Sequence, residues 1–196
     1  MSKVLEKVLN HQLQQHLKKN GLLSPEQHAY QDRKSVMTAW TEIDTITVSG
    51  LDRRKLVGYQ LQDMSAAFNL VDKDILKPKL KMLGCSEYVI KLIDSYMTGR
   101  TNSVKVQGYV SPAVEVETGV GEGSVLGPLI FLICILEVSC VMEIVREVME
   151  EKHRNIKDDV ELHTVQFADD CTNVVVTEDE WQMEVAMELC SAEYHK

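Results

Sequence analysis

Two β-prone runs flank an adjacent pair of aspartates, and this stretch constrains the fold more than any other part of the chain. Val165-Gln166-Phe167 precedes the pair Asp169-Asp170, and Cys171 to Val176 follows it. Val, Phe and Thr favour strands, and Asp tolerates the positive φ of a tight turn, so we predict a β-hairpin over 162–176 with the pair at its tip. Neighbouring carboxylates repel each other unless a hard cation lies between them and a third acid. The pair is therefore a candidate Mg²⁺ site, and the alternative is a pair of ordinary solvated turn residues.

A third acid follows an upstream stretch with strand periodicity. Apolar or aromatic residues occupy every second position through Val57, Tyr59 and Leu61, and Asp63 comes directly after them. Acids at the carboxyl end of a strand are common ligands in α/β sites. Asp63 is therefore the best candidate partner for Asp169 and Asp170.

A glycine-rich loop leads into the most apolar run of the chain. Gly119, Gly121, Gly123 and Gly127 punctuate the loop, and the apolar run 129–136 follows. Glycine lets the backbone approach a ligand closely, and a helix start offers unpaired N–H groups to an anion. The loop as a whole is therefore a candidate site for an anionic ligand.

The remaining periodicities predict an α+β fold without a regular βαβ repeat. Helices are expected over 2–19, 35–48, 75–83, 87–98, 126–152 with a break near Ser139, and 178 to the end with Thr177 as N-cap. Two strands of a further hairpin are expected over 101–107 and 113–117. The sequence shows no internal repeat or linker, so we expect a single domain over 1–196.

Charge is distributed unevenly along the chain. The net charge is −9, but residues 1–110 hold 16 Lys and Arg against 11 Asp and Glu, whereas 111–196 hold 5 against 19. Contacts to nucleic-acid phosphates would therefore come from the first half, where the basic clusters are 33–34, 53–55 and 73–81. A solvated protein face is the alternative for each cluster.

Other site classes have little support in the sequence. No run approaches the roughly 18 to 20 apolar residues of a membrane span. No targeting signal is visible, so an intracellular chain is expected, cytoplasmic or nuclear, and no basic localisation run supports the nucleus. The five cysteines have no C-x-x-C spacing and the six histidines no ligand spacing, so neither a disulfide framework nor a zinc site is expected.

Three ordered motifs resemble the reverse transcriptase of non-LTR (LINE-type) retrotransposons. They are Asp-Met-Ser-Ala-Ala-Phe-Asn-Leu-Val-Asp at 63–72, Gly-Val-Gly-Glu-Gly-Ser-Val-Leu-Gly-Pro-Leu at 119–129, and Phe-Ala-Asp-Asp at 167–170. The stretch 1–41 resembles the fingers region of the same enzymes. The resemblance implies a right-hand polymerase with fingers at about 1–55, a palm with fingers elements at about 56–196, a small antiparallel palm sheet carrying the Asp-Asp hairpin, and a chain that ends before the thumb.

The resemblance also implies a chemistry. Asp63, Asp169 and Asp170, with the Met64 carbonyl, would hold two Mg²⁺ ions, or Mn²⁺ as a substitute, for nucleotidyl transfer from a deoxynucleoside triphosphate to a primer 3′-hydroxyl. Phe68, Gly123 and Ser124, together with Met64, would contact the incoming nucleotide. The partners would be an RNA or DNA template-primer and deoxynucleotides, with no membrane.

Several departures from the family pattern keep a second interpretation open, and two of them bear on phosphate binding. Gln31 stands where a triphosphate-binding arginine is usual, and Glu122 stands where a glutamine is usual. A carboxylate at 122 would repel phosphates. The alternative to a polymerase fragment is therefore an inactive retroelement remnant, or a co-opted module that binds nucleic acid or protein.

Overall fold

The computed structural model describes residues 3–64, 66–121, 123–154, 156 and 159–194. It divides into two compact units, each built from two stretches of chain that are far apart in sequence. Unit 1 comprises Met1–Leu23 and Ser65–Ile135, and unit 2 comprises Ser24–Met64 and Leu136–Lys196. The expected mixture of helices and strands is present in the chain.

Unit 2 is built on a three-stranded antiparallel sheet with the order β1-β7-β6. The strands are β1 (Leu56–Gln62), β6 (Glu161–Phe167) and β7 (Asp170–Thr177). β6 and β7 form the predicted hairpin, closed by the pair Phe167 and Asp170. β7 is central and almost wholly buried, which explains its run of three valines, whereas β1 is an edge strand with alternating exposure.

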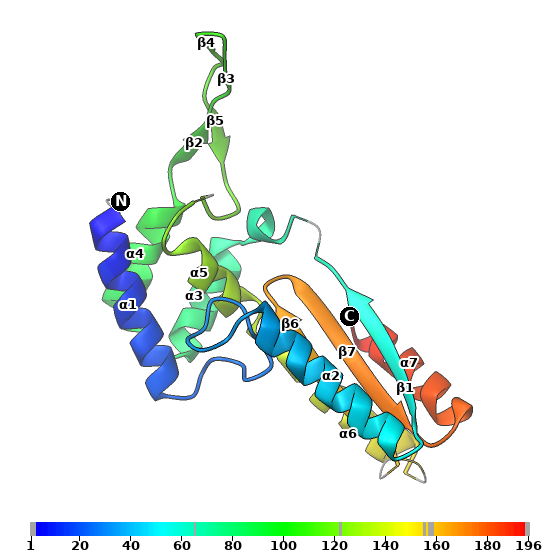
Figure 1. Ribbon diagram of the computed structural model, residues 1–196. Helices are drawn as coiled ribbons and strands as arrows, with labels where there is room; N and C mark the ends of the chain where they lie inside the picture. Colours follow the sequence, from blue (N-terminus) through cyan, green and yellow to red (C-terminus); the bar gives the residue numbers. More distant parts are fainter. Residues whose placement is uncertain (1–2, 65, 122, 155, 157–158, 195–196) are drawn as a thin grey trace. The chain divides into compact units, whose positions relative to one another are not determined.

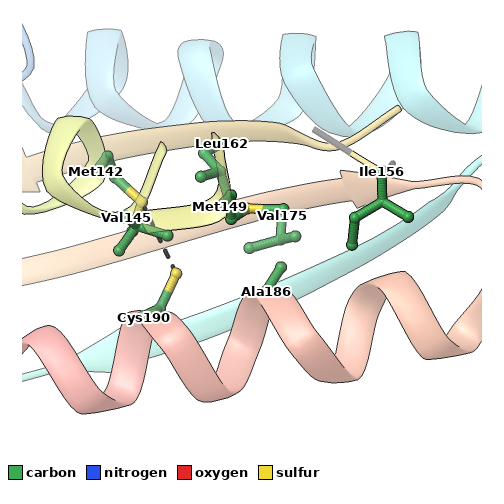
Figure 2. Packing of buried hydrophobic residues seen from close by; sticks show 8 residues of the cluster. All are labelled: Met142, Val145, Met149, Ile156, Leu162, Val175, Ala186 and Cys190. Atoms are coloured by element: carbon green, nitrogen blue, oxygen red, sulfur yellow. Dashed lines mark hydrogen bonds between the residues drawn. The ribbon is translucent and has the colours of Figure 1, made fainter. Parts of the chain in front are cut away.

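Helices cover both faces of this sheet (Figures 1 and 2). α2 (Val36–Asp52) lies on one face, where Gly50 approaches Val57 and Val176. On the other face lie α6 (Val141–Lys152), which follows the short helix η2 (Leu136–Cys140), and α7 (Glu180–Tyr194). Figure 2 shows the apolar core between that face and its helices, made of Met142, Val145, Met149, Ile156, Leu162, Val175, Ala186 and Cys190.

Unit 1 is mainly helical. Its helices are α1 (Lys3–Lys19), η1 (Ala67–Leu70), α3 (Lys73–Met82), α4 (Glu87–Met97) and α5 (Gly127–Cys134). α5 is buried over most of its length, as its apolar run predicts. α1 buries Leu9, Leu13 and Leu17, but Val4 and Val8 of the same expected face are exposed.

Three sequence expectations about elements were wrong. α2 continues through Gly50 to Asp52, because the glycine lies where the helix meets the sheet and not at a helix end. Asp179, not Thr177, caps α7: its Oδ1 accepts from the Gln182 N–H at 2.9 Å, while Thr177 belongs to β7.

The hairpin of unit 1 is the third difference. It is divided into two short pairs, β2 (Arg100–Asn102) with β5 (Val114–Val116) and β3 (Lys105–Val106) with β4 (Tyr109–Val110). Gln107 and Gly108 both have positive φ, which turns the chain between β3 and β4 and adds a strand pair that the sequence pattern did not predict.

Across the described residues, no single helix is long and apolar enough to cross a membrane, although Gly127–Cys134 and Leu136–Lys152 taken together meet the length and composition criteria. All five cysteines are free thiols.

Candidate functional site

Strand pairing in unit 2 brings Asp63 and Asp170 together. The last pair of the β1–β7 register is Gln62 with Cys171, and Asp63 and Asp170 are the next residues of the two segments, with Asp63 just beyond the end of β1. Side chains alternate between the two faces of a strand, and therefore Asp63 shares a face with Leu61, and Asp170 with Thr172. Leu61 and Thr172 are themselves a pair, so both carboxylates lie on the α2 face of the sheet.

Asp63 and Asp170 are both among the residues that line one pocket of about 590 Å³. Its wall is largely apolar and comes from α2, β1 and the hairpin; it consists of Val36, Ala39, Trp40, Ile43, Leu61, Gln62, Asp63, Val165, Gln166, Phe167, Asp170, Cys171 and Thr172. Trp40 is 59% exposed beside it. The pocket therefore combines an aromatic and aliphatic wall with two acids, which suits a ligand that has both an apolar ring and a cationic or cation-bound group.

Asp169 occupies the turn between β6 and β7. With Phe167 and Asp170 paired, the turn consists of Ala168 and Asp169 alone. The positive φ that we expected of an aspartate belongs to Ala168, at 55°. Asp169 is half-buried, whereas Asp63 and Asp170 are exposed.

The donor set suits a hard cation, but its three acids are not gathered into a ready metal site. Among the described residues, no group of three His, Cys, Asp or Glu side chains is arranged to hold a metal ion. Asp63 and Asp170 nevertheless offer oxygen ligands on one face of one pocket, which is the chemistry that Mg²⁺ requires. Met64 follows Asp63 and is half-buried.

The other three predicted site residues lie in unit 1. Phe68 stacks on Phe131 of α5, with ring centroids 4.4 Å apart and an interplanar angle of 20°. Its carbonyl accepts from the Val120 N–H at 2.9 Å, and the Val71 carbonyl accepts from the Gly119 N–H at 2.7 Å. Backbone bonds thus hold the glycine-rich loop against the segment 68–71.

Within that loop, Gly123 and Ser124 have separate structural roles. Gly123 has a φ of +68° and open space around it, so the turn requires glycine for conformation alone. The Ser124 Oγ accepts from the Gly127 N–H at 3.0 Å, which satisfies one of the free donors at the start of α5. Glu122, one of the departures from the family pattern, lies outside the described residues.

Many of the basic residues expected to contact phosphates bind protein groups instead. Arg53 forms two bonds with Glu161, at 2.5 and 2.8 Å, and Lys55 adds a third at 3.1 Å. Lys77 pairs with Asp94 at 2.6 Å. Lys34 donates to the Gln27 carbonyl at 3.0 Å, and burial lowers its pKa. For these residues, pairing with groups of the protein itself accounts for the positive charge without a phosphate contact.

Sequence reasoning missed the residues that support the hairpin turn. Gln27 is 3% exposed and bonds to both backbone groups of Ala168. Gln31 donates from its Nε2 to the carbonyls of Ser24 and Gln27, at 2.9 and 3.0 Å. A polar residue in a loop gives no periodic signal, so only tertiary structure could identify either role.

Comparison with known proteins places these features in one family. The reverse transcriptase (RNA-dependent DNA polymerase) family model matches residues 1–196, the whole chain. A probable RNA-directed DNA polymerase from transposon BS of Drosophila melanogaster is 25% identical over 140 residues, which are 71% of this chain and 15% of that protein. The chain therefore spans about a seventh of the length of this curated relative.

Solved structures share the fold. A telomerase from Candida Tropicalis truncated from its C-terminal domain aligns with a TM-score of 0.57 and 16% identity over 95% of this chain and 36% of that one. A telomerase from Candida albicans aligns with a TM-score of 0.62 and 14% identity, over 92% of this chain and 32% of that one. With a family model that matches its full length, the chain belongs to the reverse transcriptase (RNA-dependent DNA polymerase) family.

Proposed function

We propose that this chain carries the nucleotidyl-transfer centre of an RNA-directed DNA polymerase that adds deoxynucleotides to a primer 3′-hydroxyl on an RNA or DNA template. The observation that supports this most is the pairing of β1 with β7, which ends next to Asp63 and Asp170, two residues that line one pocket, in a chain of this family. In this proposal the sheet of β1, β6 and β7 is the palm of a right-hand polymerase, and part of the chain before β1 belongs to the fingers.

The three aspartates are the proposed ligands of divalent cations, Mg²⁺ or Mn²⁺. Asp63, Asp169 and Asp170 supply carboxylate oxygens, and Met64 supplies its carbonyl. When bound, such cations act as Lewis acids that favour deprotonation of the primer 3′-hydroxyl and stabilise charge on the leaving pyrophosphate. Carboxylates suit this role because a neutral amide would not offset the charge of the cations.

Phe68, Gly123 and Ser124 are the proposed nucleotide-binding residues of unit 1, with Met64 as the fourth. The backbone bond between Val120 and Phe68 supports a common role, since it ties the loop to the segment that carries the phenyl ring. A flat ring at this position would exclude a 2′-hydroxyl and so select deoxynucleotides.

The proposed template-primer is nucleic acid. The Candida albicans telomerase was solved in complex with a TWJ fragment of telomeric RNA, which supports RNA as one class of partner. Candidate cations for phosphate contact in unit 2 are Arg33 and Arg54, which are exposed and whose side chains form no hydrogen bond or ion pair with another described residue. Such contacts would be independent of base sequence and sensitive to salt.

One observation favours a second candidate, a module that binds nucleic acid without turnover. The acids of the described chain form no group of three that holds a metal ion. The two candidates differ in one measurable property, which is the formation of a new phosphodiester bond.

Primer extension tests the proposed function. The purified chain is incubated with poly(rA)·oligo(dT), dTTP and Mg²⁺, and products are resolved at single-nucleotide resolution. The proposal predicts extension by the wild type, loss of extension in Asp170→Asn, and wild-type extension in Asp44→Asn, which removes the same charge from an exposed site on α2. Binding of the duplex without extension in the wild type would favour the non-catalytic module.

A further inference from the structure

A buried glutamine outside the three motifs contacts the turn that carries two of the proposed catalytic acids. Gln27 belongs to the loop before α2 and lies in the same unit as the β6–β7 hairpin. Its Oε1 accepts from the Ala168 N–H at 2.9 Å, and its Nε2 donates to the Ala168 carbonyl at 3.2 Å. Ala168 is the residue immediately before Asp169.

These two bonds satisfy groups that the hairpin itself leaves unpaired. The closing pair of the hairpin is Phe167 with Asp170, so Ala168 and Asp169 stand outside the strand ladder. Ala168 is 8% exposed, and a buried N–H and carbonyl both need partners. The side-chain amide of Gln27 supplies one acceptor, for the Ala168 N–H, and one donor, for the Ala168 carbonyl.

Ala168 also has a conformation that its own side chain disfavours. Its φ is 55°, in the left-handed region where a β-carbon is crowded. Such a conformation persists where surrounding contacts determine it. The amide of Gln27 binds the N–H and the carbonyl of Ala168, which belong to two successive peptide groups, and thereby fixes the direction in which the chain enters Asp169 and Asp170.

The backbone around Gln27 is attached to the same hairpin. The Gln166 N–H donates to the Glu26 carbonyl at 2.9 Å, and the His28 N–H donates to the Gln166 carbonyl at 2.7 Å. Gln27 and Gln166 thus form a parallel β-bridge at the end of β6. The loop is braced in turn by the amide of Gln31, which binds the Gln27 carbonyl at 3.0 Å. Gln27 is therefore held from both sides while its side chain reaches the turn.

We infer that Gln27 is a positioning residue, which holds the Ala168 turn so that the carboxylates of Asp169 and Asp170 keep a fixed orientation. The inference rests on the proposed function for its catalytic consequence, but the contact itself can be tested separately. It acts through the backbone of Ala168 and touches neither substrate nor cation.

Two substitutions separate the two bonds. Gln27→Leu removes both. Gln27→Glu keeps an acceptor for the Ala168 N–H, but it can donate to the Ala168 carbonyl only while its carboxyl is protonated. The matched control is Gln182→Leu, because Gln182 is also buried, at 6% exposure, and accepts from the Glu178 N–H in the segment before α7, away from the turn.

The first measurement is the amide NMR spectrum of the full chain as a function of pH. We expect the Ala168 and Asp169 amide signals of Gln27→Glu to match the wild type at acidic pH and to move away as the carboxyl ionises. In Gln27→Leu these signals should be displaced at every pH. The Ala168 amide should exchange with solvent faster than it does in the wild type, with Val175 of the core as the internal reference. Wild-type signals and exchange in Gln27→Leu would overturn the inference.

The second measurement is single-nucleotide addition at saturating dTTP, below the melting temperature of every variant. We expect Gln27→Leu to lower the rate constant about ten- to hundredfold, as misplaced reacting groups do, with little change in the KM for dTTP. Gln182→Leu should lower the melting temperature but keep the rate. An altered turn with a wild-type rate would overturn the positioning role. If the wild type adds no nucleotide, the proposed function fails, and the NMR arm still decides whether Gln27 holds the turn.

Discussion

Glu161 pairs with two basic residues for which the sequence predicted a different role. Arg53 and Lys55 were candidates for phosphate contacts, but both bind the Glu161 carboxylate at the start of β6. The hydrogen bonds from Arg53 lower the pKa of Glu161 to about 2, with a smaller contribution from Lys55. The folded chain therefore favours the ionised form of Glu161 over the protonated form more strongly than the unfolded chain does.

This shift predicts an acid-sensitive contribution to stability. A carboxyl whose pKa is lowered on folding stabilises the fold above its ordinary pKa, near 4.5, and the contribution disappears as the pH falls toward 2. Glu161→Gln should therefore lower the melting temperature at pH 6 to 7 by more than it does at pH 3. Thermal unfolding followed by circular dichroism measures the difference.

The control for Glu161→Gln is Glu147→Gln, an exposed acid on α6. It removes one negative charge but leaves the ion pairs of Glu161 with Arg53 and Lys55 intact. Its effect therefore measures how much a change in net charge alone alters the melting temperature. Equal effects of Glu161→Gln at pH 3 and pH 7 would show that the ion pairs contribute nothing through ionisation. Because Arg53 and Glu161 are partly exposed, we expect a modest effect that high salt weakens.

At the scale of elements, the packing of α2 on the sheet depends on Gly50. A β-carbon at this position would lie 2.8 Å from Val57 Cγ2 and 3.0 Å from Val176 Cγ1, and both valines are short and stiff. The helix can approach β1 and β7 closely only without that side chain. The same residue was expected to end the helix, since glycine has low helix propensity.

Gly50→Ala therefore should destabilise the chain although alanine favours helices. Overpacking costs about 1 to 3 kcal/mol, and the higher helix propensity of alanine returns about 1 kcal/mol. We expect a lower urea midpoint, whereas Ser49→Ala, one residue earlier on an exposed position, should leave it unchanged or slightly raised. A stabilised Gly50→Ala variant would mean that α2 can move away from the sheet at little cost.

Most elements could be predicted from the sequence because their signals are local. The hairpin, the strand before Asp63, α1, α3 and α4 all follow from the periodicity of their apolar residues. The errors arose where a tertiary contact replaced a local preference. The position of Gly50 inside α2 is explained only by the close approach of the helix to the sheet. The positive φ of the turn belongs to Ala168, where the Gln27 amide satisfies the backbone.

At the scale of the whole molecule, the sequence predicted the family but not the two compact units. Each unit joins an early stretch to a late one, so Asp63 shares a unit with Asp169 and Asp170, although about a hundred residues separate them in the chain. The proposed metal ligands thus belong to one unit, and the nucleotide-binding candidates Phe68, Gly123 and Ser124 belong to the other. No local pattern encodes this division, because it depends on long-range contacts.

The central claim is that the β1–β7 pairing assembles a site for divalent cations, and a Mn²⁺ titration followed by electron paramagnetic resonance tests it most directly. We predict saturable Mn²⁺ binding by the wild type that Mg²⁺ displaces. The affinity for Mn²⁺ should be at least about tenfold weaker in Asp63→Asn and in Asp170→Asn, because carboxylate charge contributes to the binding of hard cations. Asp44→Asn should bind as the wild type does. Equal affinity in all four proteins, or no binding by the wild type, would contradict the claim.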